Sequence, residues 1–394
     1  MAMFTNTNPS TGDDQWTLLA KLLQLENTGT PSGQFVTPEQ YGAVGDGITD
    51  DSAAIQAALN ASSFVLFGKK SYRLASQVVF NAGNMLFGQG IGASVLILDT
   101  GLDGLYTEAS FTSIQHMTIR GISSAQRCGT AISLGNSSIT TGNTCNMESV
   151  EVKWATLGLY NGSYDGVSLR NCVFQINNTH IQSDGNVAMM KVTDCILNDT
   201  TVDTVQVTRG GNIFISGGNM NNTATSNSGY AVHVISGVAV LQGVQFERVQ
   251  NATPGAYYIF AETNTALTLN SCLFQDGNIA MKHIKCGATS SIRVQDNLIY
   301  GNTTGRFAPV IDGNGSGFDI RSSDMSGDAS FNGVYTFRVS PWHTYDSQDV
   351  LPTASVESEN MYSVVTRDSP SGSTDVATYI KKQAGGVWSY VLLA

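Results

Sequence analysis

The chain has 394 residues, of which 41% are hydrophobic and 13% are charged, and its formal net charge is −11. This hydrophobic content is enough for a packed core and excludes a disordered chain, while the scarcity of Lys and Arg argues against nucleic acid, whose phosphates are bound by clustered cations. No apolar run approaches the ~20 residues that span a membrane, so we expect no membrane insertion.

The N-terminal segment is predicted to form one helix followed by a linker. Residues 14–26 place Trp16, Leu19 and Leu25 on an apolar stripe, but a helix of this length is not stable alone in water. It is therefore expected to pack on copies of itself or on a larger assembly. Residues 27–34 have the composition of a linker, and the opening residues lack the pattern of a secretory signal.

The densest signal in the chain is "YGAVGDGITDDSAAIQAAL", residues 41–59. A short helix over 49–60 is predicted, with Thr49 or Asp50 accepting hydrogen bonds from its first amides and Asp51 favouring its positive end. A phosphate-binding loop is a weaker alternative, because the aspartates would repel phosphate and no Lys-Ser/Thr follows. The apolar stripe of the helix would consist of Ile55, Ala58 and Leu59.

A six-residue pattern then recurs through the middle of the chain: apolar, any, Asn/Asp/Gly/Ser, any, any, apolar. Successive copies begin 17 to 28 residues apart, a spacing that fits one coil of a parallel β-solenoid. Each copy would be the end of a strand, a one-residue bend with left-handed backbone angles, and a new strand. The copies begin at Val152, Leu169, Val192, Ile215, Leu241, Leu269, Val294 and Ile320.

Three cysteines, Cys172, Cys195 and Cys272, occupy the fourth position of this pattern. Strand alternation points that position inward, so we interpret them as buried packing residues stacked from coil to coil. A disulfide or a reactive thiol is the less favoured interpretation. No Cys-x-x-Cys pair exists, which argues against zinc, and no metal or other cofactor is expected.

Residues 41–59 closely resemble the N-terminal signature of the pectate-lyase-like superfamily, which includes polygalacturonases and the tailspike depolymerases of bacteriophages. Residues 85–98, "MLFGQGIGASVLIL", look like the early coil of the same family. The resemblance implies an all-β, right-handed parallel β-helix with a short N-terminal capping helix. The coils lack the Asn-Thr-Asp, Gly-His-Gly and Arg-Ile-Lys signatures of polygalacturonases and the Arg-x-Pro-x-x-Arg signature of pectate lyases, which puts pectin chemistry in doubt.

The domain organisation also resembles that of a phage tailspike or tail fibre. We assign residues 1–34 to virion docking, 35–330 to the β-helix, and 331–394 to a small C-terminal β-domain. The last is predicted from "GVYTFRV", "YSVVTR" and "GVWSYVLL". The resemblance implies a homotrimer in the virion tail, made in the host cytoplasm. It would be attached to other tail proteins by its N-terminal segment and would bind a bacterial surface polysaccharide, capsule or O-antigen.

The strand before each hexamer can be aligned by alternation, which predicts two outward columns on consecutive coils. The inward positions would be Val207, Val234, Ala261, Ile284 and Ile311. The first outward column would be Gln206, His233, Phe260, His283 and Val310. The second outward column would be Thr208, Ile235, Glu262, Lys285 and Asp312.

These columns carry the first candidate catalytic site. Glu262 and Asp312, two coils apart, would lie about 10 Å apart at the backbone, and a wide carboxylate pair suits an inverting glycosidase. Alternatively, Lys285 or one of the histidines, His233 or His283, would abstract a sugar proton in a lyase reaction. The same residues are also compatible with a solvated face that carries a weak Glu–Lys pair.

A second candidate catalytic site is formed by Glu247, Arg248 and Asp276, which fall near one corner on neighbouring coils. Its competing interpretation is a set of turn residues in water. Candidate sugar-stacking residues are Phe260, Tyr257 and Tyr258. Two functions stay open at this point, a tailspike depolymerase, hydrolase or lyase, and a non-catalytic receptor-binding or structural tail protein.

Overall fold

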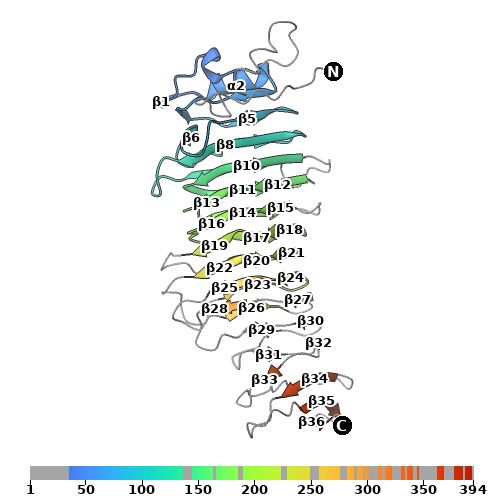
Figure 1. The fold of residues 1–394 in the computed structure, drawn as a ribbon. Helices are drawn as coiled ribbons and strands as arrows, with labels where there is room; N and C mark the ends of the chain where they lie inside the picture. Colours follow the sequence, from blue (N-terminus) through green and yellow to red (C-terminus); the bar gives the residue numbers. More distant parts are fainter. Residues whose placement is uncertain are drawn as a thin grey trace, which may run out of the picture.

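The computed structural model is a stack of parallel coils (Figure 1). It describes residues 35–392 except 136–143, 163–165, 185–189, 223–228, 249–256, 276–281, 288–290, 296–297, 301–308, 313–315, 322–329, 333–334, 340–343, 346–361, 368–376 and 385–386. Only the backbone is described from residue 295 onward and at 222, 248, 257, 282, 283 and 286. The helix expected over 14–26 lies outside the described residues.

Two long sheets form the wall of the solenoid, and their strands pair in parallel. The larger sheet has 21 described strands. They are β1 (Asp46–Asp50), β2 (Phe64–Leu66), β3 (Ser71–Leu74), β5 (Met85–Phe87), β6 (Val95–Leu98), β8 (Thr112–Gly121), β10 (Thr144–Lys153), β12 (Gly166–Arg170), β13 (Val173–Gln175), β15 (Met190–Thr193), β16 (Ile196–Asn198), β18 (Gly211–Ser216), β19 (Asn219–Asn222), β21 (Gly237–Gln242), β22 (Gln245–Arg248), β24 (Ala266–Asn270), β25 (Leu273–Gln275), β27 (Ser291–Gln295), β28 (Leu298–Tyr300), β30 (Ser316–Arg321) and β32 (Tyr335–Val339).

The 11-stranded sheet contributes one strand to each coil and carries the candidate site. Its described strands are β4 (Val78–Phe80), β7 (Leu105–Thr107), β9 (Cys128–Leu134), β11 (Ala155–Asn161), β14 (Thr179–Asp184), β17 (Val205–Thr208), β20 (Val232–Val234), β23 (Tyr257–Ala261), β26 (Lys282–Cys286), β29 (Pro309–Asp312) and β31 (Ser330–Asn332). The predicted parallel β-helix is therefore confirmed.

The predicted one-residue bends are confirmed at the described copies of the hexamer. The third residue of each copy has a positive φ, between 51° and 64°. The first copy does not align with the others in the stack of coils. Its first residue, Val152, pairs with Phe174, the sixth residue of the next copy, and not with Leu169, the first. The equivalent bend of that coil is Ser149, with φ 53°. The six bends are Trp154, Asn171, Asp194, Gly217, Gly243 and Ser271.

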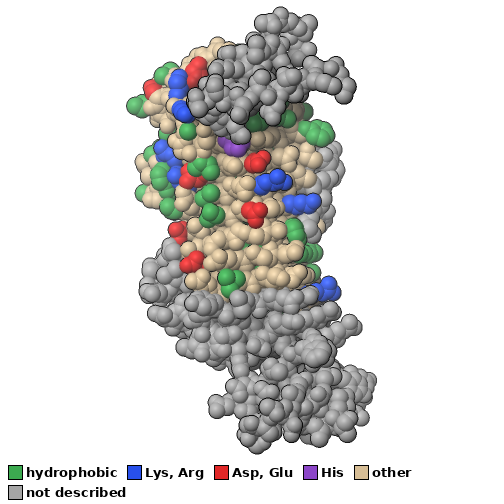
Figure 2. Space-filling model, in the orientation of Figure 1, with side chains coloured by type: hydrophobic (Ala, Val, Ile, Leu, Met, Phe, Trp, Pro, Cys, Tyr) green, Lys and Arg blue, Asp and Glu red, His purple; other side chains and the backbone are tan. Residues whose placement is uncertain are grey.

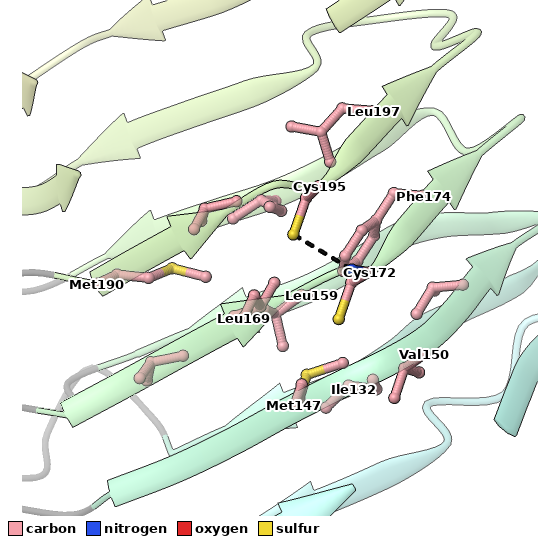
Figure 3. Packing of buried hydrophobic residues seen from close by; sticks show 14 of the residues in the cluster. Ile132, Met147, Val150, Leu159, Leu169, Cys172, Phe174, Met190, Cys195 and Leu197 are labelled. Atoms are coloured by element: carbon pink, nitrogen blue, oxygen red, sulfur yellow. Dashed lines mark hydrogen bonds between the residues drawn. The ribbon is translucent and has the colours of Figure 1, made fainter. Parts of the chain in front are cut away.

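The inside of the solenoid is filled by ladders of like side chains. Cys172 and Cys195 are buried, unpaired as disulfides and stacked on successive coils, and the Cys172 amide donates to Sγ of Cys195 at 3.4 Å (Figure 3). Phe246 and Phe274 stack with ring centroids 4.8 Å apart. Cys272 is also buried, so the packing interpretation of the three hexamer cysteines is confirmed.

The glycine-rich stretch at 41–59 starts the first coil. A 3₁₀ turn, η2 (Pro38–Tyr41), precedes it, and α2 (Ser52–Ala61) buries Ile55, Ala58 and Leu59 as predicted. Asp50 accepts from the Ser52 amide at 3.0 Å. Asp51 does not cap the helix with its side chain; its carboxylate accepts from the amides of Val44 and Gly45 at 2.7 and 3.1 Å and so holds the turn.

Parallel pairing continues beyond residue 330, since β32 pairs with β30. "GVYTFRV", expected in the C-terminal domain, therefore supplies a solenoid strand. Four further strands, three of which pair antiparallel, form a separate sheet: β33 (Thr344–Tyr345), β34 (Tyr362–Arg367), β35 (Ala377–Ala384) and β36 (Val387–Leu392). In the part of the chain that the structure describes, no helix is long and apolar enough to cross a membrane.

The surface follows from the composition. Figure 2 shows one face of the coil stack as mainly backbone and uncharged polar side chains, with charged side chains scattered singly or in small groups. On such a surface, a cluster of titratable side chains is unusual. The 11-stranded sheet carries a cluster of this kind around His233.

Candidate active site on the 11-stranded sheet

The outward column of the 11-stranded sheet is continuous through six coils. Backbone pairing places Tyr160, Gln182, Gln206, His233, Phe260 and Lys285 directly beside one another in that order. The predicted neighbours Gln206, His233 and Phe260 are confirmed. At the next coil the predicted register is wrong by two residues, because Lys285, and not His283, pairs with Phe260.

The second outward column changes accordingly. Glu262 follows Ala261, which pairs with Cys286, so its neighbour on the next coil is Gly287 and not Lys285. Asp312 follows Ile311, which pairs with Cys286. Asp312 thus occupies the register position two coils from Glu262, as expected from the sequence. His283 falls beside Tyr258, between the pairs Tyr257–Lys282 and Ile259–Ile284.

The centre of the site is a chain of three titratable side chains. His233 Nδ1 lies 2.8 Å from Oδ2 of Asp203, and its Nε2 lies 2.8 Å from Oε1 of Glu262. The exposed fraction rises along this chain, from 6% for the side chain of Asp203 through 15% for His233 to 38% for Glu262. The buried end is thus anchored and the Glu262 end meets solvent.

Asp203 is held by three donors. Its Oδ1 accepts from the Tyr230 amide at 2.7 Å, and its Oδ2 accepts from Gln206 Nε2 at 2.8 Å as well as from His233. Burial raises the pKa of the Asp203 carboxyl, but these hydrogen bonds outweigh it and bring the pKa below its usual value. Asp203 is therefore ionised at neutral pH.

The proton count of the cluster follows from these contacts. Each His233 contact requires one hydrogen, because an ionised carboxylate only accepts, and a neutral imidazole carries one N–H. Burial lowers the pKa of His233, but the hydrogen bonds and charges of Asp203 and Glu262 raise it above its usual value overall. A protonated His233 therefore satisfies both contacts at once, with one N–H on each carboxylate.

Aromatic rings lie against His233. His233 stacks on Phe260 with centroids 5.2 Å apart and 19° between the planes. Tyr230 lies 5.0 Å from the His233 ring and 5.2 Å from Phe260, and Lys285 Nζ lies 4.9 Å from the centroid of Phe260. Aromatic faces and hydrogen-bonding groups side by side suit a saccharide, which has both apolar faces and hydroxyls.

The prediction of a stacking surface is wrong for Tyr258. Its side chain is 1% exposed, packs against Phe246 and Phe274, and donates to the Gln275 carbonyl at 3.0 Å. Tyr257 pairs with Lys282 along the backbone, and its side chain lies outside the described atoms.

The second candidate site lies on the other sheet. Glu247 sits between Asn221 and Gln275 in an outward column, and Asn221 Nδ2 is 3.5 Å from Oε2 of Glu247. Arg248 pairs with Asn222 along the backbone, and Asp276 lies outside the described residues. The described neighbours of Glu247 in this column, Asn221 and Gln275, both carry side-chain amides.

Sequence reasoning missed Asp203 and Tyr230. Both lie just before the strands they serve, and each acts on a residue of another coil, so the hexamer pattern gave no signal for them. Within the described residues, no group of three or more His, Cys, Asp or Glu side chains is arranged to hold a metal ion.

Comparison with known proteins gives one family match. Residues 35–257, more than half of the chain, match the family model described as rhamnogalacturonase A/epimerase, pectate lyase-like. A 30-residue stretch is 60% identical to depolymerase 1 of Klebsiella phage K5-2, described as specific for capsule K30/K69. That stretch is 8% of this chain and only 4% of the depolymerase.

Solved structures share the architecture at low sequence identity. The enzymatically active domain of tailspike protein 2 from bacteriophage CBA120 has a TM-score of 0.56 at 13% identity, over 81% of this chain and 48% of that one. PfbA, a surface adhesin of Streptococcus pneumoniae, has a TM-score of 0.51 at 12% identity, over 91% of this chain and all of that one. An enzyme domain and an adhesin thus have the same fold, so function must be argued from the site.

Proposed function

This chain belongs to the rhamnogalacturonase A/epimerase family of pectate-lyase-like proteins, which confirms the predicted membership of the pectate-lyase-like superfamily, and we propose that it is a phage tailspike that binds and cleaves a bacterial surface polysaccharide. The local identity to a phage capsule depolymerase supports the substrate class. The observation that carries the catalytic part is the 2.8 Å contact between His233 Nε2 and Glu262 Oε1, with His233 held through its other nitrogen by Asp203.

The aromatic side of the site would bind the sugar. Phe260 lies beside the His233–Glu262 pair, and Tyr230 extends the aromatic surface toward the preceding coil. Because His233 stacks on the Phe260 ring and Lys285 Nζ lies over it, a sugar would meet the outward edges of these rings, with a glycosidic oxygen toward the exposed end of Glu262. Gln206, next to His233 in the column, is a candidate to contact the sugar hydroxyls.

In the hydrolytic form of the proposal, Glu262 is the general acid. Its carboxyl donates a proton to the glycosidic oxygen as the bond to the anomeric carbon breaks, and His233 returns a proton to Glu262. A water molecule attacks the anomeric carbon and gives its proton to a carboxylate on the far side of the sugar. Asp312 occupies a suitable position two coils away, a backbone distance of about 10 Å, which favours inversion of configuration.

In the eliminative form, the sugar next to the cleaved bond is a uronate. A base takes the proton from C5, the bond from C4 to the glycosidic oxygen breaks, and an unsaturated sugar is left. Lys285, His233 and His283 are the candidate bases, and Glu262 would protonate the departing oxygen. Nζ of Lys285 lies over Phe260, the ring on which His233 stacks, and Lys285 is the first of these candidates to test.

A receptor-binding protein without catalysis is the second candidate. The observation that favours it is that both nitrogens of His233 are hydrogen-bonded within the protein, as expected of a structural histidine. The aromatic surface alone would then bind the polysaccharide.

One incubation separates these functions. The protein is mixed with purified Klebsiella capsular polysaccharides, beginning with types K30 and K69, and with O-antigen from the same strains. Product size is then followed by mass spectrometry and unsaturation by ultraviolet absorbance. Saturated oligosaccharides indicate a hydrolase, unsaturated ones a lyase, and retention without cleavage a binding protein. Failure to bind any of them would overturn the proposal.

The proposed assembly is a homotrimer in the virion tail, with residues 1–34 docked onto another tail protein. Light scattering should give three times the 41.8 kDa mass of one chain. Removal of residues 1–34 should abolish incorporation into virions and leave polysaccharide binding intact, since the first coil begins after this segment. A single-chain mass at micromolar concentration would contradict the trimer.

A further inference from the structure

A second polar cluster lies on the same sheet, toward the N-terminal end. Asp184 ends β14 and pairs with Thr208, and the backbone ladder continues from Val207 to Ile235 and from Val234 to Glu262. Asp184 and Glu262 therefore share one outward column, three coils apart, which is about 14 Å at the spacing of neighbouring strands.

The cluster is built around the Asp184 carboxylate. Tyr160, on the preceding coil, donates its hydroxyl to Oδ2 of Asp184 at 2.8 Å. The Tyr160 ring reaches this position by lying over Gly162, where an added Cβ would sit 2.5 Å from ring atom Cε1. Burial and the Asp184 hydrogen bond raise the pKa of Tyr160 to about 12, so its hydroxyl keeps its proton.

The other oxygen of Asp184 is buried without a hydrogen bond. Only 6% of the side chain is exposed, and Oδ1 accepts from no residue that the structure describes. Nε of Arg209 lies 3.6 Å away, outside hydrogen-bonding distance, and 66% of the Arg209 side chain is exposed. A buried acceptor that lacks a donor is costly, and here it faces an exposed cation.

We infer that Tyr160, Asp184 and Arg209 form a second saccharide-binding site, in which the exposed Arg209 guanidinium donates to one sugar oxygen and, by turning from Asp184 toward the sugar, opens the buried Oδ1 of Asp184 to a neighbouring sugar hydroxyl. A polysaccharide lying along the solenoid axis would occupy this site and the Glu262 site together. The inference rests on the proposed function, and it adds a site that anchors the chain away from the bond that is cut.

The chemistry of the cluster selects a polyol over an ion. An anion would approach Arg209 but meet the carboxylate of Asp184. A cation at the carboxylate would be repelled by Arg209, whose Nε lies 3.6 Å from Oδ1 of Asp184. A neutral pair of adjacent oxygens, one donating and one accepting, satisfies both side chains.

The test uses three variants of the full chain and two matched controls. Asp184→Asn keeps the shape and removes the charge, and Tyr160→Phe removes the hydroxyl that holds Asp184. Arg209→Asn removes the guanidinium; asparagine suits this position because Arg209 has φ 49°, where it is among the tolerated residues. The controls, Asp194→Asn and Arg170→Asn, change exposed residues on the larger sheet.

Each variant is made in the Glu262→Gln protein, which is expected to bind the polysaccharide without cutting it. The affinity of each variant for the Klebsiella polysaccharide that this parent protein binds is then measured by calorimetry. Asp184→Asn and Arg209→Asn should each weaken binding about tenfold or more, and Tyr160→Phe should weaken it less. In the active protein the same changes should raise KM and shift products toward other lengths. Thermal unfolding checks that each variant is folded. If Asp184→Asn does not fold, Arg209→Asn still tests the site, because it changes an exposed side chain.

Two failures are distinguishable. If the parent protein binds a polysaccharide and Arg209→Asn binds it as tightly as the Arg170→Asn control does, the second site is wrong and the proposed function stands. If the parent protein binds none of the polysaccharides, both the site and the proposed function are overturned.

Discussion

Glu262 Oε1 lies 2.8 Å from Nε2 of His233, a residue 29 positions earlier in the chain. The contact exists because one coil of the solenoid returns the backbone to the neighbouring strand, where Val234 pairs with Ala261. The exposed carboxylate thereby gains an imidazole partner whose pKa is raised above its usual value. This pair is the most direct target for mutation.

Glu262→Gln is expected to slow polysaccharide cleavage by about 10²–10⁴-fold, the usual contribution of a general acid or base. The amide keeps the shape and the hydrogen bond to His233, so binding should largely survive. Glu148→Gln on the larger sheet is the matched control, and its cleavage rate should equal that of the wild type. If Glu247→Gln inactivates the protein and Glu262→Gln does not, the reaction belongs to the second candidate site.

The state of His233 predicts a pH dependence. Because its pKa is raised in the folded protein, it holds its proton more tightly there than in the unfolded chain. Its contribution to the free energy of unfolding is therefore complete below about pH 6.5 and is lost as the pH rises through the folded pKa. The difference in melting temperature between wild type and His233→Gln should be larger at about pH 5.5 than at about pH 9.

Asp203→Asn tests the origin of this shift, because it removes one of the two carboxylates that raise the pKa of His233. The pKa of His233, followed by NMR through its imidazole resonances, should be lower in the variant than in the wild type. Cleavage by the wild type should fall on the alkaline side as His233 loses its proton, and this fall should move to lower pH in Asp203→Asn. An unchanged titration of His233 would show that Asp203 does not set its pKa.

The solenoid could be predicted from the hexamer because each bend needs a residue that tolerates a left-handed backbone. The register of the strand that carries Lys285 could not be predicted from the sequence. A strand that slips by two residues keeps the same side chains inside and outside, so alternation placed Ile284 inward correctly but could not choose between Ile259 and Ala261 as its partner. The role of Asp203 could not be predicted for another reason: it lies outside the strands, and its contacts depend on how neighbouring coils stack.

The bends provide a stability test with an internal control. Gly218 and Gly243 both have positive φ, but a Cβ on Gly218 would lie 2.1 Å from the Cys195 carbonyl oxygen, whereas one on Gly243 meets its nearest atom at 4.0 Å. Gly243→Ala should cost about 1–2 kcal/mol of the free energy of unfolding, from backbone strain alone. Gly218→Ala should cost clearly more in urea-induced unfolding, because the backbone of the preceding coil must move. Equal losses would show that the coils are not stacked as closely as this.

The buried thiols give a measure of the integrity of the solenoid. Burial raises the pKa of Cys145 and Cys272 to about 11, and Cys172 and Cys195 are also buried. In a Cys286→Ser protein, which removes the one thiol outside the described side chains, labelling by a thiol reagent should follow the unfolding curve in urea. Rapid labelling of Cys172 in the native protein would contradict its position in the core.

Because every coil meets its neighbours through the same backbone ladder, a whole coil can be gained or lost in evolution while this pairing is kept. A lineage that duplicates or loses one coil lengthens or shortens the spike by a single strand spacing, about 4.8 Å, without a new kind of junction. The separation between Asp184 and Glu262 is then set by a whole number of coils, and relatives of this protein can differ in reach only by discrete steps.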